Sequence, residues 1–472
     1  MPKIIWMSPP VPTDTACIVC GNAQNNVIIL NASHWHQDKA ALNVAFCKQC
    51  QSAYTVNASD VIVPYPSAEV VLQDPNFIYL IYQYLEIASG LDWKLPLLER
   101  LPYQQFKSIL EIGCNVGVTL DYCRTAWGAD VLGLEPSAYG IKGAELLEIP
   151  IINAYTYEAQ ELRERKFSFI YATEVLEHVP DPLSFLKEMR TYLESDGILL
   201  ITTPCSASLR PETLPGELYA VLSPGAHYFL LSQQQLQQLA YAAGFTHCVI
   251  ELFGNTNIAY LSSRPIDMLP VPAIYTRMMH YYSIKKDGLN IQDRVQLGHL
   301  LNYYIYSVKS GESFINEFDT NRRVDEALAT VFNISLDAPL ALAERVVRVQ
   351  SIFDLGKEIP YSLPFYLYHK AQVLNEGGNS PNHFYELAAL IAVQGLRVDF
   401  QNLFLYHNIF QSCMKKIGVH SSNSHKNNHI TILLREMIEE ARAGIPELNH
   451  QSLSIFSKLK RKMREFRKLV AF

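Results

Sequence analysis

The residues best suited to binding a small molecule lie in a glycine turn and at an acid further along the chain. The mainly apolar residues 108–112 predict a buried strand, and residues 113–117 follow it with the sequence G-C-N-V-G. Glu135 ends a second apolar run. Glycine lets the backbone approach a ligand without a Cβ in the way, and an acid at the second strand's end can accept hydrogen bonds from both hydroxyls of a ribose. The order strand, turn, helix, strand and acid therefore predicts a Rossmann-like unit that holds an adenosine-containing ligand.

The spacing of the glycines separates two classes of adenosine ligand. A dinucleotide fingerprint reads G-x-G-x-x-G, with its third glycine inside the helix. Only Gly113 and Gly117 are present here, and Asn115 takes the middle place. Asparagine is among the non-glycine residues that best tolerate a positive φ, so the turn can still form. The spacing disfavours an NAD-linked dehydrogenase, while a tight turn without a ligand stays an alternative.

A second group of motifs follows downstream. Residues 167–172 predict a strand of a parallel sheet, and residues 173–182 read T-E-V-L-E-H-V-P-D-P. A helix at 183–193 and a strand at 198–204 come next. Thr173 and Glu174 end the first of these strands, at the carboxyl edge where open α/β sheets bind ligands.

These motifs, in this order, resemble the class I S-adenosylmethionine (SAM) methyltransferases over residues 79–263. The resemblance implies an α/β fold with a seven-stranded Rossmann-like sheet, closed by an antiparallel hairpin of residues 246–252 and 257–262. It also implies SAM as the cofactor. The SAM contacts that it implies are Glu111, Gly113, Cys114, Asn115, Gly117, Glu135, Pro136, Ser137, Asn153, Ala154, Thr173 and Glu174.

Four cysteines form a separate constellation near the N-terminus. Cys17, Cys20, Cys47 and Cys50 make two C-x-x-C knuckles, joined by a loop a little longer than usual for this pattern. Four thiolates complete a tetrahedral zinc site and leave no open position, so a bound zinc would be structural. A redox dithiol and unliganded cysteines are the alternatives, and His34 or His36 could replace a ligand. The sugar C-methyltransferases, which this chain also resembles, carry such a module before the SAM domain, and this implies a sugar substrate.

Two histidines are candidates for the catalytic base. His227 lies in residues 224–232, which loosely resemble a substrate-side segment of the sugar C-methyltransferases, although the first Tyr-His-Glu of that segment is absent. Its loss leaves O-, N- and C-methylation open. A neutral histidine can take a proton near pH 7, but a structural loop histidine is an equal alternative. For His178, which we expect to open a helix, capping or packing explains the residue as well as catalysis does.

The chain of 472 residues predicts several domains. We expect a zinc module at 1–60, a linker with a lid helix at 61–101, the SAM domain at 102–263 and a mainly α-helical domain at 264–450. The helical patterns fall at 295–308, 324–332, 340–353, 362–374 and 381–394. Residues 451–472 predict a basic amphipathic tail helix. From 454 to 472 its apolar residues fall on one face, and its cations crowd much of the remainder. Such a helix could bind an anionic membrane surface or a protein partner, or dock against an acidic face of the same protein.

Composition and charge exclude several classes of function. The net charge of −7 argues against nucleic acid as the main partner. We see no secretory signal and no apolar run long enough to span a membrane, so we expect a cytoplasmic protein, with the tail as the one route to a membrane surface. A small molecule such as a nucleotide sugar is the expected substrate, in surface-glycan or natural-product biosynthesis, and a homo-oligomer is compatible with the sequence. The alternative is a catalytically inactive SAM-binding scaffold that holds a protein partner through its helical domain.

Overall fold

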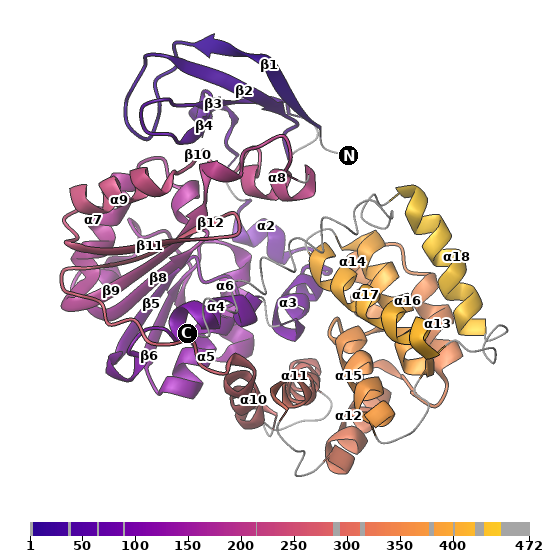
Figure 1. Ribbon diagram of the computed structural model, residues 1–472. Helices are drawn as coiled ribbons and strands as arrows, with labels where there is room; N and C mark the ends of the chain where they lie inside the picture. The colour runs from indigo at the N-terminus through magenta and orange to yellow at the C-terminus, as the bar shows by residue number, and fades with distance from the viewer. Residues whose placement is uncertain are drawn as a thin grey trace. The chain divides into compact units, whose positions relative to one another are not determined.

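The fold of this chain is described from a computed structural model, shown in Figure 1. It describes residues 3–444, except 36–38, 64–65, 88–89, 214, 287–292, 312–316, 377–381, 400–401 and 421–428. The chain forms two compact units. The first comprises Met1–Gln73 and Leu101–Met268, and the second comprises Asp74–Arg100 and Leu269–Phe472.

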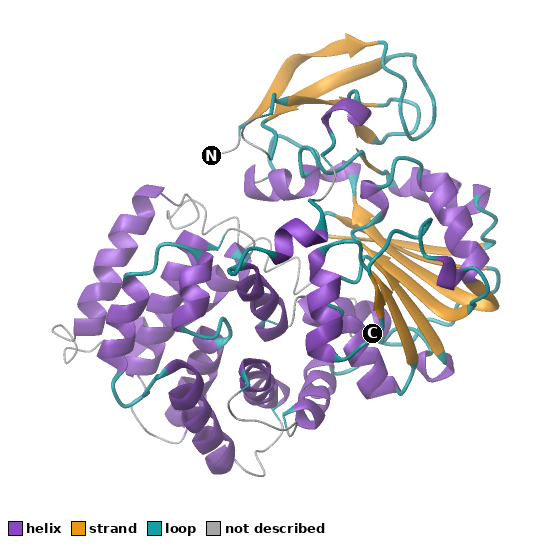
Figure 2. Cartoon of the chain, turned by 180° about the vertical axis from the view of Figure 1, so that it is seen from behind, coloured by secondary structure: helices purple, strands orange, loops and turns teal. Residues whose placement is uncertain are grey.

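The first unit is built on a seven-stranded sheet with the order β11-β12-β9-β8-β5-β6-β7. The strands β5 to β9 run parallel, and β12 joins β9 antiparallel and pairs with β11 in a hairpin. This confirms the expected Rossmann-like sheet with its closing hairpin (Figure 2). The strands are β5 Ser108–Ile112, β6 Asp130–Leu134, β7 Ile151–Ile152, β8 Phe167–Thr173, β9 Leu193–Pro204, β11 His247–Phe253 and β12 Thr256–Ser262.

Helices cover this sheet because its strands are apolar along both faces. Every residue of β8 is buried, as expected of a central parallel strand. Helices α5 (Val118–Trp127) and α6 (Ala138–Leu147) pack on β5, β6 and β7, whereas α7 (Pro182–Tyr192) and α9 (Gln233–Ala242) pack on β9, β11 and β12. The hydroxyl of Ser232 caps α9 by accepting the N–H of Gln235 at 3.1 Å, as serine commonly does at the start of a helix.

A second, five-stranded sheet lies in the same unit, with the order β1-β2-β3-β4-β10. Its first four strands are N-terminal, and the fifth comes from the segment that follows α8 (Pro215–Leu222). The N-terminal module and the methyltransferase-like segment therefore share one sheet, which the sequence did not reveal. The strands are β1 Ile4–Thr13, β2 Asn26–Ala32, β3 Leu42–Phe46, β4 Ala53–Thr55 and β10 Phe229–Leu230. The short helices α1 Ala58–Val61 and α2 Ala68–Leu72 follow β4.

The second unit is helical, as expected. Much of its core is a cluster of apolar side chains drawn mainly from α11 to α18. The helices are α3 Phe77–Glu86, α4 Leu91–Leu98, α10 Ile274–Lys285, α11 Arg294–Ser310, α12 Glu317–Phe332, α13 Pro339–Val347, α14 Ile352–Glu358, α15 Leu363–Glu376, α16 Asn382–Val398, α17 Leu403–His420 and α18 His429–Gly444.

The segment expected as a linker and lid is divided between the two units. Residues 74–100, with α3 and α4, cluster with the helical unit. The reason is a buried ion pair, in which Arg294 donates from Nε to Glu86 Oε1 at 2.5 Å and its guanidinium lies 4.4 Å from the ring centroid of Tyr82. The pairing partner of Glu86 is remote in sequence, so local pattern does not show it.

Two further expectations concern the C-terminal half. The helix expected at 340–353 is two helices, α13 and α14, because Ser351 caps a new helix by accepting the N–H of Asp354 at 3.1 Å. The basic tail helix at 451–472 lies outside the described residues, so its membrane or partner contact stays a prediction, as do the homo-oligomer and the cytoplasmic location.

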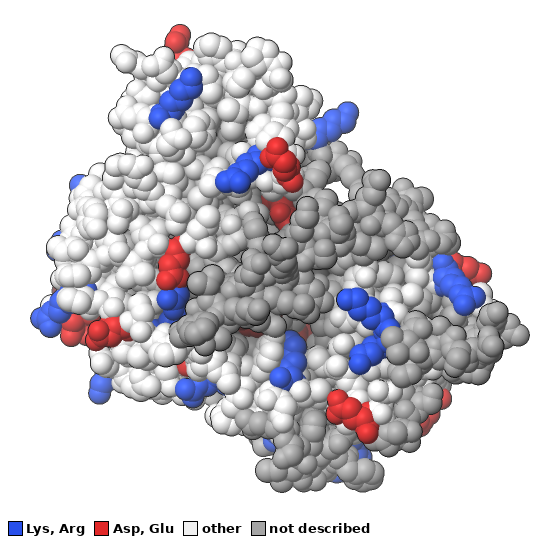
Figure 3. Space-filling view, in the orientation of Figure 1, with Lys and Arg blue, Asp and Glu red and all other residues white. Residues whose placement is uncertain are grey.

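Among the described residues, no helix is both long and apolar enough to cross a membrane. On the face drawn in Figure 3, the charged side chains of the described residues are scattered rather than gathered.

Candidate functional site

The glycine turn and Glu135 meet at the carboxyl ends of β5 and β6. Oε2 of Glu135 accepts the backbone N–H of Asn115 at 2.9 Å, and Oε1 accepts the N–H of Ser137 at 3.0 Å. Asn115 has a φ of 52°, between Gly113 and Gly117 at 67° and 77°. Asparagine therefore does adopt the left-handed conformation that the sequence required of it. Its Oδ1 accepts the N–H of Val116 at 2.7 Å and stabilises the turn.

The carboxylate of Glu135 retains acceptor capacity after these contacts. A carboxylate offers about four lone-pair sites, and the two backbone N–H groups use only two of them. The residue is half-buried, so part of it remains accessible. Two ribose hydroxyls fit this set of acceptors, and the residues present therefore suit an adenosine ligand.

The neighbouring predicted contacts are held close to the same edge. The side chain of Asn153 donates to the carbonyl oxygens of Glu135 and Ser137, at 2.8 and 2.9 Å. Pro136 lies between those two residues, and Ala154 follows Asn153. The hydroxyl of Ser137 accepts the N–H of Tyr139 at 3.3 Å and begins α6. The predicted adenine-side residues are thus brought together by hydrogen bonds to one loop.

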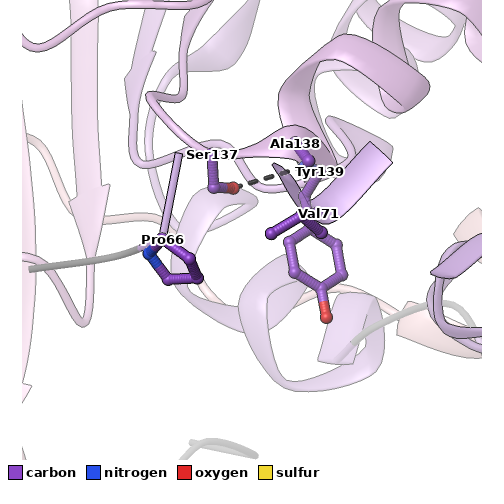
Figure 4. Close-up of a pocket in the computed structure, with 5 residues that line it drawn as sticks. All are labelled: Pro66, Val71, Ser137, Ala138 and Tyr139. Atoms are coloured by element: carbon purple, nitrogen blue, oxygen red, sulfur yellow. Dashed lines mark hydrogen bonds between the residues drawn. The ribbon is translucent and has the colours of Figure 1, made fainter. Parts of the chain in front are cut away.

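A small apolar pocket of about 60 Å³ opens beside this loop (Figure 4). Its walls come from α2 and the segment before it, and from the start of α6. The lining residues are Pro66, Val71, Ser137, Ala138 and Tyr139. The residues from 66 to 71 had not been expected at the site, since nothing in their sequence indicates a ligand.

Glu111 and Cys114, two further predicted contacts, are both buried. Glu111 is buried within the sheet, where its Oε2 accepts the hydroxyl hydrogen of Tyr171 on β8 at 2.7 Å. Burial, followed by the charge of Glu111, raises the pKa of Tyr171 well above its ordinary value, so the tyrosine is a stable donor. Cys114 is also buried. The side chain of Glu111 is therefore arranged to support the strands below the turn.

Thr173 and Glu174 end β8 at the same edge as the glycine turn. Glu174 has a φ of 57°, a conformation that costs free energy in a non-glycine residue and that concentrates at functional sites. Its N–H donates to Thr202 at the adjacent strand β9, and the hydroxyl of Thr202 donates to Oε1 of Glu174 at 2.9 Å. A Cβ built on Gly113 would lie 2.6 Å from Cγ2 of Val175. The segment after β8 therefore packs directly on the glycine turn.

The two predicted histidines lie side by side next to this segment. The rings of His178 and His227 are 4.6 Å apart between centroids and meet edge to face, at 81°. His178 lies in a short 3₁₀ turn, Leu176–His178, rather than at the start of a helix. His227 is buried between α8 and β10, where Nδ1 lies 2.9 Å from the carbonyl oxygen of Val221.

Glu177, which sequence reasoning did not select, completes this cluster. It is fully buried, and Oε2 accepts the hydroxyl hydrogen of Thr203 at 2.9 Å. Oε1 has no hydrogen-bond partner among the described residues and lies 3.9 Å from Nε2 of His227. The signal for Glu177 was its position beside His178 just after a strand, but its partner His227 is distant in the sequence.

Burial controls the protonation of the cluster. It lowers the pKa of His227 to about 3, with the neighbouring His178 adding to the effect, and it lowers the pKa of His178 as well. Burial, followed by the nearby charge of Glu174, raises the pKa of Glu177 well above its ordinary value. Both imidazoles are therefore neutral at pH 7.

The four N-terminal cysteines also come together. Cys17 and Cys50 have their Sγ atoms 3.8 Å apart, and Cys20 and Cys47 have theirs 3.7 Å apart. All four Sγ atoms lie within 4.8 Å of one another. A tetrahedral zinc ion with Zn–S bonds of about 2.3 Å places its sulfur atoms about 3.8 Å apart. The cysteines therefore fit a four-thiolate metal site. His34 is occupied elsewhere, with Nε2 2.9 Å from the carbonyl oxygen of Val61, and His36 lies outside the described residues.

The cysteine knuckle at 47–50 is joined to the segment that carries His227. The hydroxyl of Ser232 donates to the carbonyl of Cys50 at 2.7 Å, and that of Thr55 donates to the carbonyl of His227 at 2.8 Å. Strands β4 and β10 pair between these contacts. The N-terminal module therefore helps to fix the position of His227.

Comparisons with known proteins agree with this architecture. Residues 86–250 match a family model described as a methyltransferase domain. Two curated relatives are named ubiquinone biosynthesis O-methyltransferase. The one from Actinobacillus pleuropneumoniae serotype 7 (strain AP76) is 33% identical over 107 residues, which are 21% of this chain and 45% of the relative. The one from Rhodopseudomonas palustris (strain HaA2) is 35% identical over 100 residues, which are 20% of this chain and 39% of the relative. The chain spans less than half the length of these relatives.

Solved structures give weaker matches. An O-methyltransferase family protein from Burkholderia thailandensis aligns with 42% of this chain and 62% of its own, at 8% identity and a TM-score of 0.34. The plantazolicin methyltransferase BpumL, solved with a substrate analogue and SAH, aligns with 42% of this chain and 94% of its own, at 16% identity and a TM-score of 0.33. Residues 86–250 are therefore similar to a methyltransferase domain, and the strand order is the one expected of the Rossmann-like sheet.

Proposed function

We propose that this chain is a SAM-dependent methyltransferase that methylates a hydroxyl oxygen of a small molecule. The observation that carries the proposal is the position of Glu135, whose carboxylate is held against the glycine turn by the N–H groups of Asn115 and Ser137. It retains the acceptors that a ribose needs. The family match to a methyltransferase domain and the names of the curated relatives support the reaction and the oxygen acceptor.

The residues around Glu135 are assigned roles on this basis. Gly113, Cys114, Asn115 and Gly117 would hold the amino-acid part and the ribose, while Pro136, Ser137, Asn153 and Ala154 would line the adenine side. Thr173 and Glu174 would face the reacting groups, because they end β8 beside the glycine turn. Glu111 would support the turn from below through Tyr171.

Methyl transfer asks little covalent chemistry of the protein, because SAM supplies an activated methyl group. The chain must hold the acceptor oxygen in line with that group, exclude water and accept a proton. We assign the acceptor side to His178 and His227, which lie past the end of β8 and beside β10. A buried imidazole whose pKa is about 3 is a weak base, so His227 is better suited to orient a hydroxyl than to deprotonate it.

We also propose that the four cysteines hold a structural zinc ion, because their sulfur spacing fits a tetrahedral site and leaves no open coordination position. The module would then contribute to stability and to the placement of His227 rather than to bond making. The substrate is proposed to be a small hydroxylated metabolite. The resemblance of the cysteine module to that of the sugar C-methyltransferases favours a sugar, and the names of the relatives favour an oxygen acceptor of the kind used in ubiquinone biosynthesis.

The test is transfer of labelled methyl from SAM by the zinc-loaded full chain to two acceptor panels, nucleotide sugars and catechol-like phenols. We expect methyl incorporation in one panel and its loss in Glu135→Ala. An absence of transfer in both panels, together with an absence of SAM binding, would contradict the enzyme assignment and favour a scaffold. The control is Glu145→Ala, since Glu145 is an exposed residue of α6 whose carboxylate pairs with Lys142 at 2.6 Å.

A further inference from the structure

The cluster of Glu177, His178 and His227 has the composition of a metal site, and its ligand atoms lie close together. Each of the three side chains offers a ligand atom, and these atoms lie within 4.8 Å of one another. Two ligands that are each about 2.1 Å from one metal ion lie at most about 4.2 Å apart. The 3.9 Å between Oε1 of Glu177 and Nε2 of His227 is within that limit.

The hydrogen bonds of the two histidines indicate which ring nitrogen would face a metal. Nδ1 of His227 lies 2.9 Å from the carbonyl oxygen of Val221, and Nδ1 of His178 lies 3.2 Å from that of Ala226. A carbonyl oxygen only accepts, so each Nδ1 carries the hydrogen and each Nε2 carries the lone pair. Histidine ligands of metals are typically held in this way, by a second N–H bond to a backbone carbonyl.

The loop before His227 is shaped to provide both carbonyl groups. Ser223 and Gly225 have positive φ values of 35° and 101°, and the N–H groups of Ala226 and His227 both donate to the carbonyl of Ser223. The resulting tight turn brings the carbonyl of Ala226 to His178 while His227 reaches back to Val221. The hydroxyl of Thr55, on β4 of the five-stranded sheet, donates a hydrogen bond to the carbonyl of His227.

Glu177 completes the set in a way that a purely structural role does not explain. A buried carboxylate oxygen without a hydrogen-bond partner costs free energy, of order 1–3 kcal/mol or more for a charged group. Oε1 of Glu177 is such an atom among the described residues, while Oε2 is held by Thr203. A cation at the centre of the cluster would satisfy Oε1 and remove this cost.

We propose that Glu177, His178 and His227 bind a divalent first-row transition-metal ion, distinct from the zinc of the four cysteines. Two imidazoles and one carboxylate form a set that such ions prefer, and three protein ligands leave positions open for an exogenous oxygen. The cluster follows β8, next to the glycine turn through the contact of Val175 with Gly113. An acceptor hydroxyl could therefore occupy an open position.

This assignment deepens the proposed function, on which it rests for its role in catalysis. An acceptor R–OH bound to the metal loses its proton to water more readily, because the cation stabilises R–O⁻. An electron pair of the oxygen then forms the O–CH₃ bond, and the pair of the breaking S–CH₃ bond stays on sulfur. The products are R–OCH₃, S-adenosylhomocysteine and the released proton.

The test is binding of Co²⁺ to the zinc-loaded full chain, followed by calorimetry and visible absorption. Zinc occupies the cysteines, and Co²⁺ bound to imidazole and carboxylate lacks the thiolate charge-transfer absorption that a cysteine site would give. We expect one Co²⁺ per chain without that absorption. Loss of an outer-shell partner already weakens metal sites 10–100-fold, so Glu177→Gln should weaken Co²⁺ binding by more than about 100-fold.

The control is His247→Gln, which removes a histidine on β11 outside the cluster and should leave Co²⁺ affinity unchanged. Retained zinc content and SAM affinity in Glu177→Gln show that the variant is folded. If wild-type protein binds no Co²⁺ beyond any exchanged into the cysteines, or if Glu177→Gln binds it equally well, the proposal is wrong. Co²⁺ binding at the cluster without SAM binding would instead leave the metal site standing and contradict the proposed function. SAM-dependent transfer by protein shown to lack the second metal would leave the proposed function standing and contradict the role of the metal site in catalysis.

Discussion

Glu135 Oε2 accepts the backbone N–H of Asn115 at 2.9 Å, and this bond ties the end of β6 to the turn after β5. The carboxylate is thereby oriented before any ligand arrives, since a second N–H, from Ser137, fixes its other oxygen. Preorganisation of this kind reduces the ordering cost of binding. The strength of cofactor binding should therefore depend on the charge of Glu135 more than on the size of its side chain.

The first prediction concerns that charge. Glu135→Gln keeps the shape of the side chain but removes its charge and replaces one acceptor oxygen by a donor. Hydrogen bonds to charged groups contribute about 1.5–3 kcal/mol, so SAM affinity should fall by at least about 10-fold. Calorimetric titration measures the change, with Glu145→Gln as the matched control. Equal affinities for the wild type and Glu135→Gln would show that the ribose is not held by this residue.

The second prediction separates backbone strain from crowding at the turn. Gly117 has a φ of 77°, and a Cβ there would lie 2.3 Å from Cδ1 of Ile149. Gly254 also has a positive φ, 58°, but no atom lies within 4 Å of its Cβ position. Gly254→Ala should lose about 1–2 kcal/mol of unfolding free energy from strain alone, whereas Gly117→Ala should lose about 1–3 kcal/mol more from overpacking.

Urea unfolding measures both variants of this pair. Asn115→Gly is the companion variant, because glycine adopts the φ of 52° without strain although it loses the bond to Val116. It should retain SAM binding. If Gly117→Ala and Gly254→Ala are equally stable, the turn is not packed as described.

The third prediction concerns removal of the structural metal. Cys50→Ser removes one of the four proposed zinc ligands, and Cys50 also supplies the carbonyl that accepts from Ser232. We expect loss of bound zinc and faster amide hydrogen exchange at Phe229–Leu230, because β10 pairs with β4 of that module. Cys248→Ser, on β11 and outside the cluster, is the control. Full zinc content in Cys50→Ser, or unchanged exchange in β10 after zinc loss, would contradict this coupling.

The fourth prediction is a pH dependence of stability in the helical unit. Burial lowers the pKa of His369 to about 3, with the charge of Lys309 adding to the effect. In the unfolded chain the pKa is about 6.5, so the unfolded state binds the proton first as pH falls. The stabilisation is complete above pH 6.5 and is lost as pH falls toward 3, by at most about 1.4 kcal/mol per pH unit.

His369→Gln isolates this contribution, because glutamine can still donate to Oε1 of Gln372, which lies 2.7 Å from Nδ1 in the wild type. Urea unfolding at pH 7, 6 and 5 should show a smaller loss of stability in the variant. Parallel losses in the two proteins would mean that His369 takes up a proton without unfolding the unit.

The sheet of the first unit could be predicted because its signals are local. The turn at Gly113 and Gly117, the apolar strands and the acid Glu135 each fall within a short stretch of sequence, and their order defines the topology. The cap at Ser232 and the four cysteines are local signals as well. A pattern of this kind fixes which elements form and in which order they follow.

Contacts between distant segments could not be predicted in the same way. Strand β10 pairs with β4, although most of the N-terminal half of the sequence separates the two strands. Glu86 pairs with Arg294, which is also distant in the sequence. Glu177 was not selected for the same reason, since its significance depends on His227 in another loop. Nothing in the sequence near any one of these residues identifies its partner.

The most direct test of the central claim is calorimetric titration of the zinc-loaded full chain with SAM and S-adenosylhomocysteine, with NAD as the competing ligand. The account predicts saturable binding of both SAM and S-adenosylhomocysteine at one site per chain, no binding of NAD, and loss of binding in Glu135→Ala. Binding of NAD in place of SAM, or of none of the three by folded protein, would contradict it.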